Sequence, residues 1–238
     1  MTISHLGNVK IFHNELLAGS FCKLEEMAVQ FCHQLSTIFS STTVGVFHCL
    51  EKLRVVGCDS LEHIFELGGL NIEEKVGVEY SQLRELEISW LPALKHVWNN
   101  DPLGIPTFQN LRKVKAWECS SLKNLFPVSI AKELTQLEYL EISSCGVEEI
   151  VSAGERLEQP IRFEFPQVSY LELTNLNELK CFYPGNHATV WPMLKKLKTD
   201  YSTLLKIVAS ERSSTEEMNE NGQRDSTIRQ QHLLVEEV

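Results

Sequence analysis

The sequence contains no apolar segment long enough to enter or cross a membrane. Its first residues, MTISHLGNVKIFHNELLAG, lack a cationic start followed by a continuous apolar run, so no signal peptide is predicted. No stretch approaches about 18 consecutive apolar residues, which excludes a helical membrane span. None of the asparagines begins an Asn-x-Ser/Thr glycosylation sequon. Together these absences predict a cytoplasmic protein.

Basic side chains are outnumbered by acidic ones. The 238 residues include 22 Lys and Arg against 32 Asp and Glu, which gives a net charge of −10 and an isoelectric point near 5.3. A general nucleic-acid binder or a protein attracted to anionic lipid needs an excess of positive charge. We therefore predict neither class of partner.

Motifs for nucleotide binding and for common hydrolases are also missing. The sequence has no GxxxxGK[ST] loop, no GxGxxG and no GxSxG. The His and Asp residues are too scattered to nominate a catalytic triad. We predict no enzyme activity and no cofactor.

A cluster of cysteines and histidines near the N-terminus raises the question of a zinc site. Within about 37 residues, a spacing compatible with a metal site, lie Cys22, Cys32, His33, His48, Cys49 and Cys58. The chain has seven cysteines, an odd number that does not suit a complete disulfide framework. It has no CxxC or HxxxH pair of the kind that binds zinc. Whether these residues form a zinc site depends on their positions in the repeat that extends along the chain.

A repeated apolar pattern extends along most of the chain. In LEKLRVVGCDSLEHIF, which begins at Leu50, apolar residues lie at offsets 0, 3, 5, 8, 11 and 14 from that leucine. The same pattern fits from Leu24, Leu83, Leu111 and Val168. It fits less completely from Leu137, where one residue is missing, and from Leu194, where polar residues replace apolar ones. Seven units result, with starts separated by 26, 33, 28, 26, 31 and 26 residues.

This pattern is the signature of leucine-rich repeats. The apolar residues at offsets 3 and 5 leave one face of a short strand, because side chains alternate along a strand. Stacked units pair these strands and merge the apolar positions into one core. We predict an α/β repeat solenoid, a leucine-rich-repeat horseshoe with about seven short parallel strands on the concave face. Irregular loops and short helical turns are expected on the convex face, sealed by an aromatic side chain at offset 15.

The repeat accounts for most of the cysteines. Cys32, Cys58, Cys119 and Cys145 all occupy offset 8, where other units carry leucine. A small, buried residue suits that position. The repeat therefore predicts four core cysteines and no zinc site, and it leaves His33 as a surface neighbour.

Three segments of the chain are expected to behave differently. Residues 1–20 form a lead-in or partial repeat, 21–209 the repeat domain, and 210–238 a polar tail predicted to be disordered. Within the repeats, insertions at 66–82 and 152–167 are expected to be loops. The segment 127–136 is expected to form a helical turn or two, with Pro127 at its start.

The solvent side of the predicted strands, at offsets 2, 4 and 6, is the candidate binding face. Charge changes sign from strand to strand, and pairs such as Glu87 with Lys115 are expected across neighbouring strands. Such a face is either a solvated surface or a protein-binding surface with aromatic anchors. The candidate binding residues are Lys52, Arg54, Glu85, Glu87, Lys113, Lys115, Trp117, Tyr139, Glu141, Tyr170, Glu172, Lys196 and Lys198.

Several phrases resemble one protein family over about residues 9–210. They include GSFCKLEEM, LEKLRVVGCDSLEHIFEL, LRELEISWLPALKHVWNNDP, FQNLRKVKAWECSSLKNLFP, LEYLEISSCGVEEIV and LKCFYPGNHATVWPMLKKL. The family is the leucine-rich-repeat region of plant coiled-coil nucleotide-binding disease-resistance proteins. The resemblance implies recognition of a pathogen effector or a guarded host protein, and autoinhibitory contact with the nucleotide-binding domain of the same receptor.

This chain departs from the family in lacking a coiled-coil domain and a nucleotide-binding domain, so nucleotide binding is not expected. We expect a fragment of a larger receptor or a truncated product, since neither end supplies a polar cap. The alternative is a generic leucine-rich-repeat adaptor, such as a ubiquitin-ligase substrate receptor, although no F-box helix pair is evident.

Overall fold

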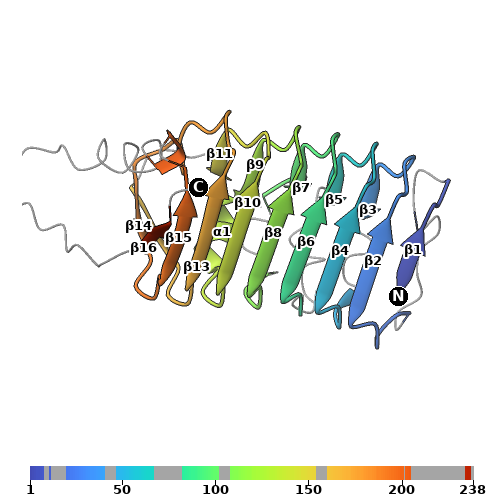
Figure 1. The fold of residues 1–238 in the computed structure, drawn as a ribbon. Helices are drawn as coiled ribbons and strands as arrows, with labels where there is room; N and C mark the ends of the chain where they lie inside the picture. The colour runs from blue at the N-terminus through green and yellow to red at the C-terminus, as the bar shows by residue number, and fades with distance from the viewer. Residues whose placement is uncertain are drawn as a thin grey trace, which may run out of the picture.

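The protein is a solenoid whose main feature is a nine-stranded parallel sheet (Figure 1). This computed structural model describes residues 1–7, 11, 20–40, 47–66, 82–101, 108–153, 160–200, 202–204 and 234–236, the last without side chains. In order along the sheet, its strands are β1 (Thr2–Ser4), β2 (Glu26–Gln30), β4 (Lys52–Val56), β6 (Glu85–Ser89), β8 (Lys113–Trp117), β10 (Tyr139–Ser143), β13 (Tyr170–Thr174), β15 (Lys196–Thr199) and β16 (Leu234–Glu236).

The register of this sheet confirms the predicted repeat. Neighbouring strands pair residues of equal offset, so Leu53 lies opposite Leu86 and Leu86 opposite Val114. These side chains at offset 3 are buried, as are those at offset 5, such as Val55 and Ile88. Seven of the strands are the predicted ones, and their inward apolar side chains enter one continuous core, while Thr199 of β15 is a buried polar residue.

The opposite side of the solenoid carries a second parallel sheet where irregular loops were expected. Its strands, in spatial order, are β11 (Glu149–Ser152), β9 (Asn124–Pro127), β7 (His96–Trp98), β5 (His63–Phe65) and β3 (Thr37–Phe39). Stacking explains the difference, because the backbone of each turn lies beside the same segment of the next. The amide of Glu62 thus donates to the carbonyl of Ser36, and that of Lys95 to Glu62. Pairing satisfies backbone groups that a loop would leave to water.

The aromatic residues at offset 15 are buried beneath this second sheet. Phe39, Phe65, Trp98 and Phe126 form a stack along the solenoid, with successive ring centroids 5.2, 5.9 and 5.7 Å apart. Offset or tilted ring pairs at such distances add stabilisation beyond the area they bury. The stack confirms the predicted position of the aromatics on the side away from the first sheet.

The predicted helical turn is present, and one predicted loop is partly a strand. Helix α1 (Val128–Glu133) begins directly after Pro127, whose fixed φ suits a helix start. In the insertion at 152–167, β12 (Ile161–Glu164) pairs in parallel with β14 (His187–Val190). Phe163 of β12 is buried against Phe182 and Tyr183, which explains why the segment is ordered. Most of the insertion at 66–82 lies outside the described residues.

Both flanks of the seven predicted strands carry one more strand. On one side, Ile3 of β1 lies opposite Val29 in the repeat register. On the other side, β16 pairs with β15, with Val235 opposite Leu197. The structure therefore has a strand at 234–236, within the tail expected to be disordered. The rest of that tail lies outside the described residues.

Candidate protein-binding face

The solvent side of the nine-stranded sheet, called the open face here, presents three rows of side chains. The first row, at offset 2, is Glu26, Lys52, Glu85, Lys113, Tyr139, Tyr170 and Lys196. The second, at offset 4, is Ala28, Arg54, Glu87, Lys115, Glu141, Glu172 and Lys198. The third, at offset 6, includes Trp117. The structure thus brings all thirteen predicted residues together on one surface.

Lysines in the first half of this face are held by carboxylates on neighbouring strands. Lys52 Nζ lies 3.4 Å from Glu26 and 3.5 Å from Glu85. Lys113 Nζ lies 2.7 Å from Glu87 and 3.6 Å from Glu85. The hydrogen bond to Glu87 raises the pKa of Lys113, and the same bond lowers the pKa of Glu87. Both members of that pair therefore stay charged at neutral pH.

The expected pair of Glu87 with Lys115 does not form, although their backbones lie opposite each other. Glu87 instead binds Lys113 on the diagonal, and Lys115 Nζ lies 3.0 Å from Glu141 on the next strand. Long side chains reach diagonal partners across a sheet. Lys115 also lies over the ring of Tyr139, 5.0 Å from its centroid, which draws it toward β10.

The tyrosines and glutamates of β10 and β13 form a tight cluster. The Tyr139 and Tyr170 hydroxyls donate to Glu141 Oε2 at 2.7 Å and Glu172 Oε2 at 2.6 Å, respectively. Lys198 Nζ donates to Glu172 Oε1 at 2.8 Å. Burial raises the pKa of Glu172, but its hydrogen bonds outweigh that effect and hold the pKa below the usual value. Burial together with the bond to Glu172 raises the pKa of Tyr170 to about 12.

Burial separates the predicted residues into two kinds. Glu172 is only 8% exposed, so it supports the face from within and offers little surface to a partner. Trp117, by contrast, is 45% exposed at the end of β8, and Arg54 is exposed near the middle of β4. Of the predicted aromatic anchors, Trp117 is therefore the accessible one, because Tyr139 and Tyr170 are half-buried against each other.

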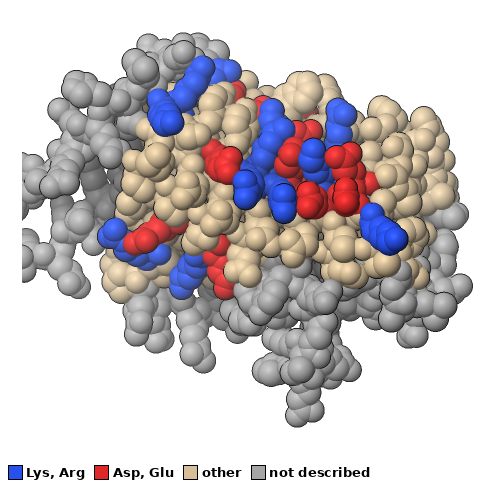
Figure 2. All heavy atoms as spheres, turned by 90° about the horizontal axis from the view of Figure 1, so that it is seen from below, with Lys and Arg blue, Asp and Glu red and all other residues tan. Residues whose placement is uncertain are grey.

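The open face as a whole is close to neutral and shallowly hollowed. Its three rows carry six Lys or Arg and six Asp or Glu residues, including Asp200, although the chain has a net charge of −10. A hollow of about 250 Å³ lies over β2, β4 and β6, where Ala28 leaves space beside Arg54. Figure 2, turned by 90° from Figure 1, looks from below at the edge where these strands begin, and charges of both signs lie side by side there too. Such a surface selects partners by the arrangement of charge rather than by its overall sign.

Sequence reasoning missed two exposed aromatic residues next to this face. Phe31 and Trp90 lie at offset 7, directly after β2 and β6, and both have a positive φ, 53° and 55°. Trp90 packs edge-on against Trp117, with ring centroids 5.2 Å apart. The sequence did contain a signal for the positive φ at offset 7, because the equivalent residues Gly57 and Asn175 are types that favour this conformation.

The cysteines at offset 8 are core residues, as the repeat predicts. Cys32, Cys58, Cys119 and Cys145 are buried, and each thiol lies 3.3–3.6 Å from the carbonyl oxygen two residues earlier. Burial raises the pKa of Cys58 to about 11. Among the described residues, no group of three or more His, Cys, Asp or Glu side chains is arranged to hold a metal ion. His33 lies at the surface, 2.8 Å from Asp59.

The parallel strands, their common register and the continuous leucine-rich core define the protein as a leucine-rich-repeat solenoid. Its residues 1–146 match the family described as plant disease resistance protein RPS2-like, leucine-rich repeats. The match covers more than half of the chain, and the protein belongs to this family. No helix in the described part of the chain has the length and apolar character needed to cross a membrane.

Two relatives from Arabidopsis thaliana are similar over parts of their length. The chain is 26% identical over 113 residues to the probable disease resistance protein At4g27220, which covers 47% of this chain and 12% of the relative. It is 28% identical over 198 residues to the probable disease resistance protein At1g12290, which covers 76% of this chain and 20% of the relative. The chain therefore corresponds to a fifth or less of these relatives.

Proposed function

We propose that this chain is the protein-recognition module of an intracellular plant immune receptor and that it acts in the cytoplasm. The open face is the proposed contact surface, with Trp117 as its accessible anchor and Arg54, Glu87 and Lys115 as determinants of specificity. The single observation that supports this most is the arrangement of charge on the face. Opposite charges are placed in fixed positions over consecutive strands, with an exposed aromatic residue at their edge.

The ion pairs on this face suit selective binding better than the stabilisation of the fold. Pairs with solvent-exposed members contribute little to folding, about 0–1 kcal/mol each. A partner with matching charges gains attraction along the rows, whereas a partner with the wrong arrangement meets like charges and loses affinity. The face therefore distinguishes between proteins of similar overall charge.

Two kinds of partner follow from the family. One is a pathogen effector or a host protein altered by it, and the other is the nucleotide-binding domain of the receptor to which such repeats belong. Contact with the second would hold the receptor inactive, and binding of the first would compete with it. The nucleotide itself would bind to the other domain, and this chain would supply only the contact.

The test is binding of the purified chain to nucleotide-binding domains and candidate effectors from the same plant and its pathogens, measured by biolayer interferometry. Charge reversal by Lys115→Glu and removal of the anchor by Trp117→Ala should each weaken binding about tenfold or more. The matched control is Arg162→Glu, which reverses an exposed cation on β12, away from the open face. If both open-face variants bind every partner as well as the unmodified chain does, the proposed function is wrong.

A further inference from the structure

The ends of the nine-stranded sheet's strands share an unusual backbone conformation. The residue at offset 7 has a positive φ between 53° and 64° in Phe31, Gly57, Trp90, Glu118, Ser144 and Asn175. This left-handed region is unfavourable for residues with a β-carbon and unrestricted for glycine. Gly57 shows that the fold accepts glycine at this offset. A large aromatic residue here is therefore not required by the backbone.

Trp90 is nevertheless a tryptophan in this position, and its side chain faces water. It is 51% exposed, and Trp117 beside it is 45% exposed, with the two rings edge to face. Exposed apolar area and a strained backbone both reduce stability. Contiguous exposed apolar surface of this kind is typical of interaction sites.

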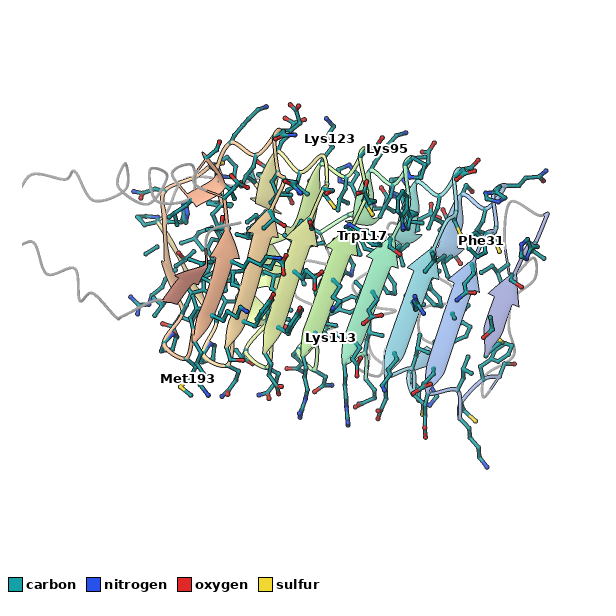
Figure 3. The ribbon with its side chains drawn as sticks, viewed as in Figure 1. Phe31, Lys95, Lys113, Trp117, Lys123 and Met193 are labelled. Carbon is teal, nitrogen blue, oxygen red and sulfur yellow. The ribbon has the colours of Figure 1, made fainter. Side chains whose placement is uncertain are left out.

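Two lysines lie along the same end of these repeats, in a row of charges at offset 12. The row consists of Glu62, Lys95, Lys123, Glu148 and Lys180. Lys95 binds Glu62 at 3.0 Å, and Lys123 binds Glu148 at 2.5 Å. Lys95 and Lys123 are neighbours, and in this described row no carboxylate stands between them. Figure 3 shows both lysines at the edge beyond Trp117.

The same row shows how two lysines, two repeats apart, share one carboxylate. Glu148 lies between Lys123 and Lys180, with each ammonium 2.5 Å from one of its carboxylate oxygens. Hydrogen bonds from these two lysines lower the pKa of Glu148 to about 2. Each of these lysines therefore binds a carboxylate one strand spacing away in the next repeat, whereas Lys95 and Lys123 face each other directly at that spacing. A carboxylate that contacts both Lys95 and Lys123 would have to come from another molecule.

The net positive charge of this part of the chain favours an acidic partner. Residues 82–101 and 108–126 contain six Lys or Arg and four Asp or Glu, a net charge of +2 in a chain whose total is −10. Opposite charge on a partner speeds encounter and selects it over neutral segments. The aromatic pair would at the same time contact an apolar side chain.

We propose that Trp90, Trp117, Lys95 and Lys123, named the rim here, dock an acidic segment of a protein partner. A carboxylate of that segment bridges Lys95 and Lys123, and an apolar or aromatic side chain beside it packs on Trp90 and Trp117. This inference rests on the proposed function, because it assigns a chemical class to part of the partner. It extends the contact from Trp117 of the open face to the edge of the sheet, where Trp90, Lys95 and Lys123 lie.

The test uses three short fluorescein-labelled peptides, built from repeated Glu-Glu-Leu, Gln-Gln-Leu or Glu-Glu-Ser units, and fluorescence anisotropy with the whole chain. The Glu-Glu-Leu peptide should bind about tenfold or more tighter than either of the others, since each lacks one half of the contact. Its affinity should fall as salt is raised. Trp90→Gly and Lys95→Gln should each reduce that affinity about tenfold, and circular dichroism should show both variants folded.

Two matched controls change similar residues elsewhere. Met193→Gly removes another exposed apolar side chain, and Lys132→Gln removes an exposed cation on α1. Both should bind the Glu-Glu-Leu peptide like the unmodified chain. Equal binding of the three peptides, or unchanged binding by both rim variants, overturns the proposal.

The outcomes also separate this inference from the proposed function. Binding of a natural partner that is lost on Lys115→Glu but kept on Trp90→Gly and Lys95→Gln overturns the rim and leaves the open face intact. Selective peptide binding that depends on Trp90 and Lys95, with no partner sensitive to Lys115→Glu, supports the rim and overturns the rest of the open face as the recognition surface.

Discussion

The rings of Tyr139 and Tyr170 stack face to face, with centroids 4.4 Å apart and planes 2° apart. Each hydroxyl donates to the glutamate two residues later on its own strand. The glutamates Glu141 and Glu172 are neighbours across the strands and would repel each other if left without donors. The stacked tyrosines therefore allow two carboxylates to lie side by side in the middle of the sheet.

The first prediction concerns acid stability. The folded pKa of Glu172 lies below its ordinary value, so the protonated form is disfavoured in the folded state. Its contribution to the free energy of unfolding is complete above the unfolded pKa, about 4.3, and is lost as pH falls through the folded pKa. Urea unfolding at about pH 7 and pH 3 should show a loss of stability on acidification that is smaller in Glu172→Gln. An equal loss in both proteins would contradict this role for Glu172.

The second prediction concerns the core positions at offset 3. Leu86 and Leu140 are almost completely buried, and Leu86→Asp or Leu140→Asp would place an unpaired charge there. Each change should cost more than about 4 kcal/mol and abolish the cooperative melting transition followed by circular dichroism. Glu87→Lys, one residue beyond Leu86 on the open face, should fold with a small change in stability. Normal melting of both aspartate variants would show that the repeat register is wrong.

The third prediction concerns the shortened fifth repeat. One residue is missing after Cys145, and the backbone of Gly146 approaches the preceding turn, where its amide donates to the carbonyl of Cys119 at 3.1 Å. A β-carbon at Gly146 would lie within van der Waals overlap of the Ser120 carbonyl oxygen. Gly146→Ala should therefore reduce the free energy of unfolding by about 1–3 kcal/mol or more, measured by urea titration. Gly7→Ala is the control, because nothing lies near its β-carbon.

The fourth prediction concerns thiol reactivity. Cys22, Cys49 and Cys181 are partly exposed, whereas the four cysteines at offset 8 are buried. The reagent reaches partly exposed thiols and not buried ones, and burial also raises the pKa of Cys58 to about 11, which leaves little reactive thiolate there. Brief iodoacetamide treatment of the native chain, followed by mass spectrometry, should modify the first three and spare the other four until urea unfolds the protein. Early labelling of Cys58 or Cys119 would place the offset-8 column outside the core.

The sequence predicted the scaffold because its signal is periodic and local. Leucine or another apolar residue at offsets 3 and 5 requires one buried strand face, and repetition of that pattern requires strands stacked in register. The same periodicity identified the buried cysteines and the aromatic stack from Phe39 to Phe126. For these features, burial of each residue follows from its place in the repeat.

Contacts between side chains of different repeats could not be predicted in the same way. Glu87 binds Lys113 rather than Lys115, and Glu172 is buried, because long side chains choose among several partners within reach on adjacent strands. The second sheet likewise depends on how the return segments of neighbouring turns meet. These choices depend on spacing and competition in three dimensions.

The division between residues that enter the core and residues that face water thus follows from the sequence alone, since it rests on a pattern repeated along the chain. The tertiary structure decided which exposed residues act together. It placed Trp90 beside Trp117 and left Lys95 next to Lys123, because stacking brings residues 27 or 28 positions apart to within one strand spacing. Geometry of this kind is a property of the stacked repeats and of no single one.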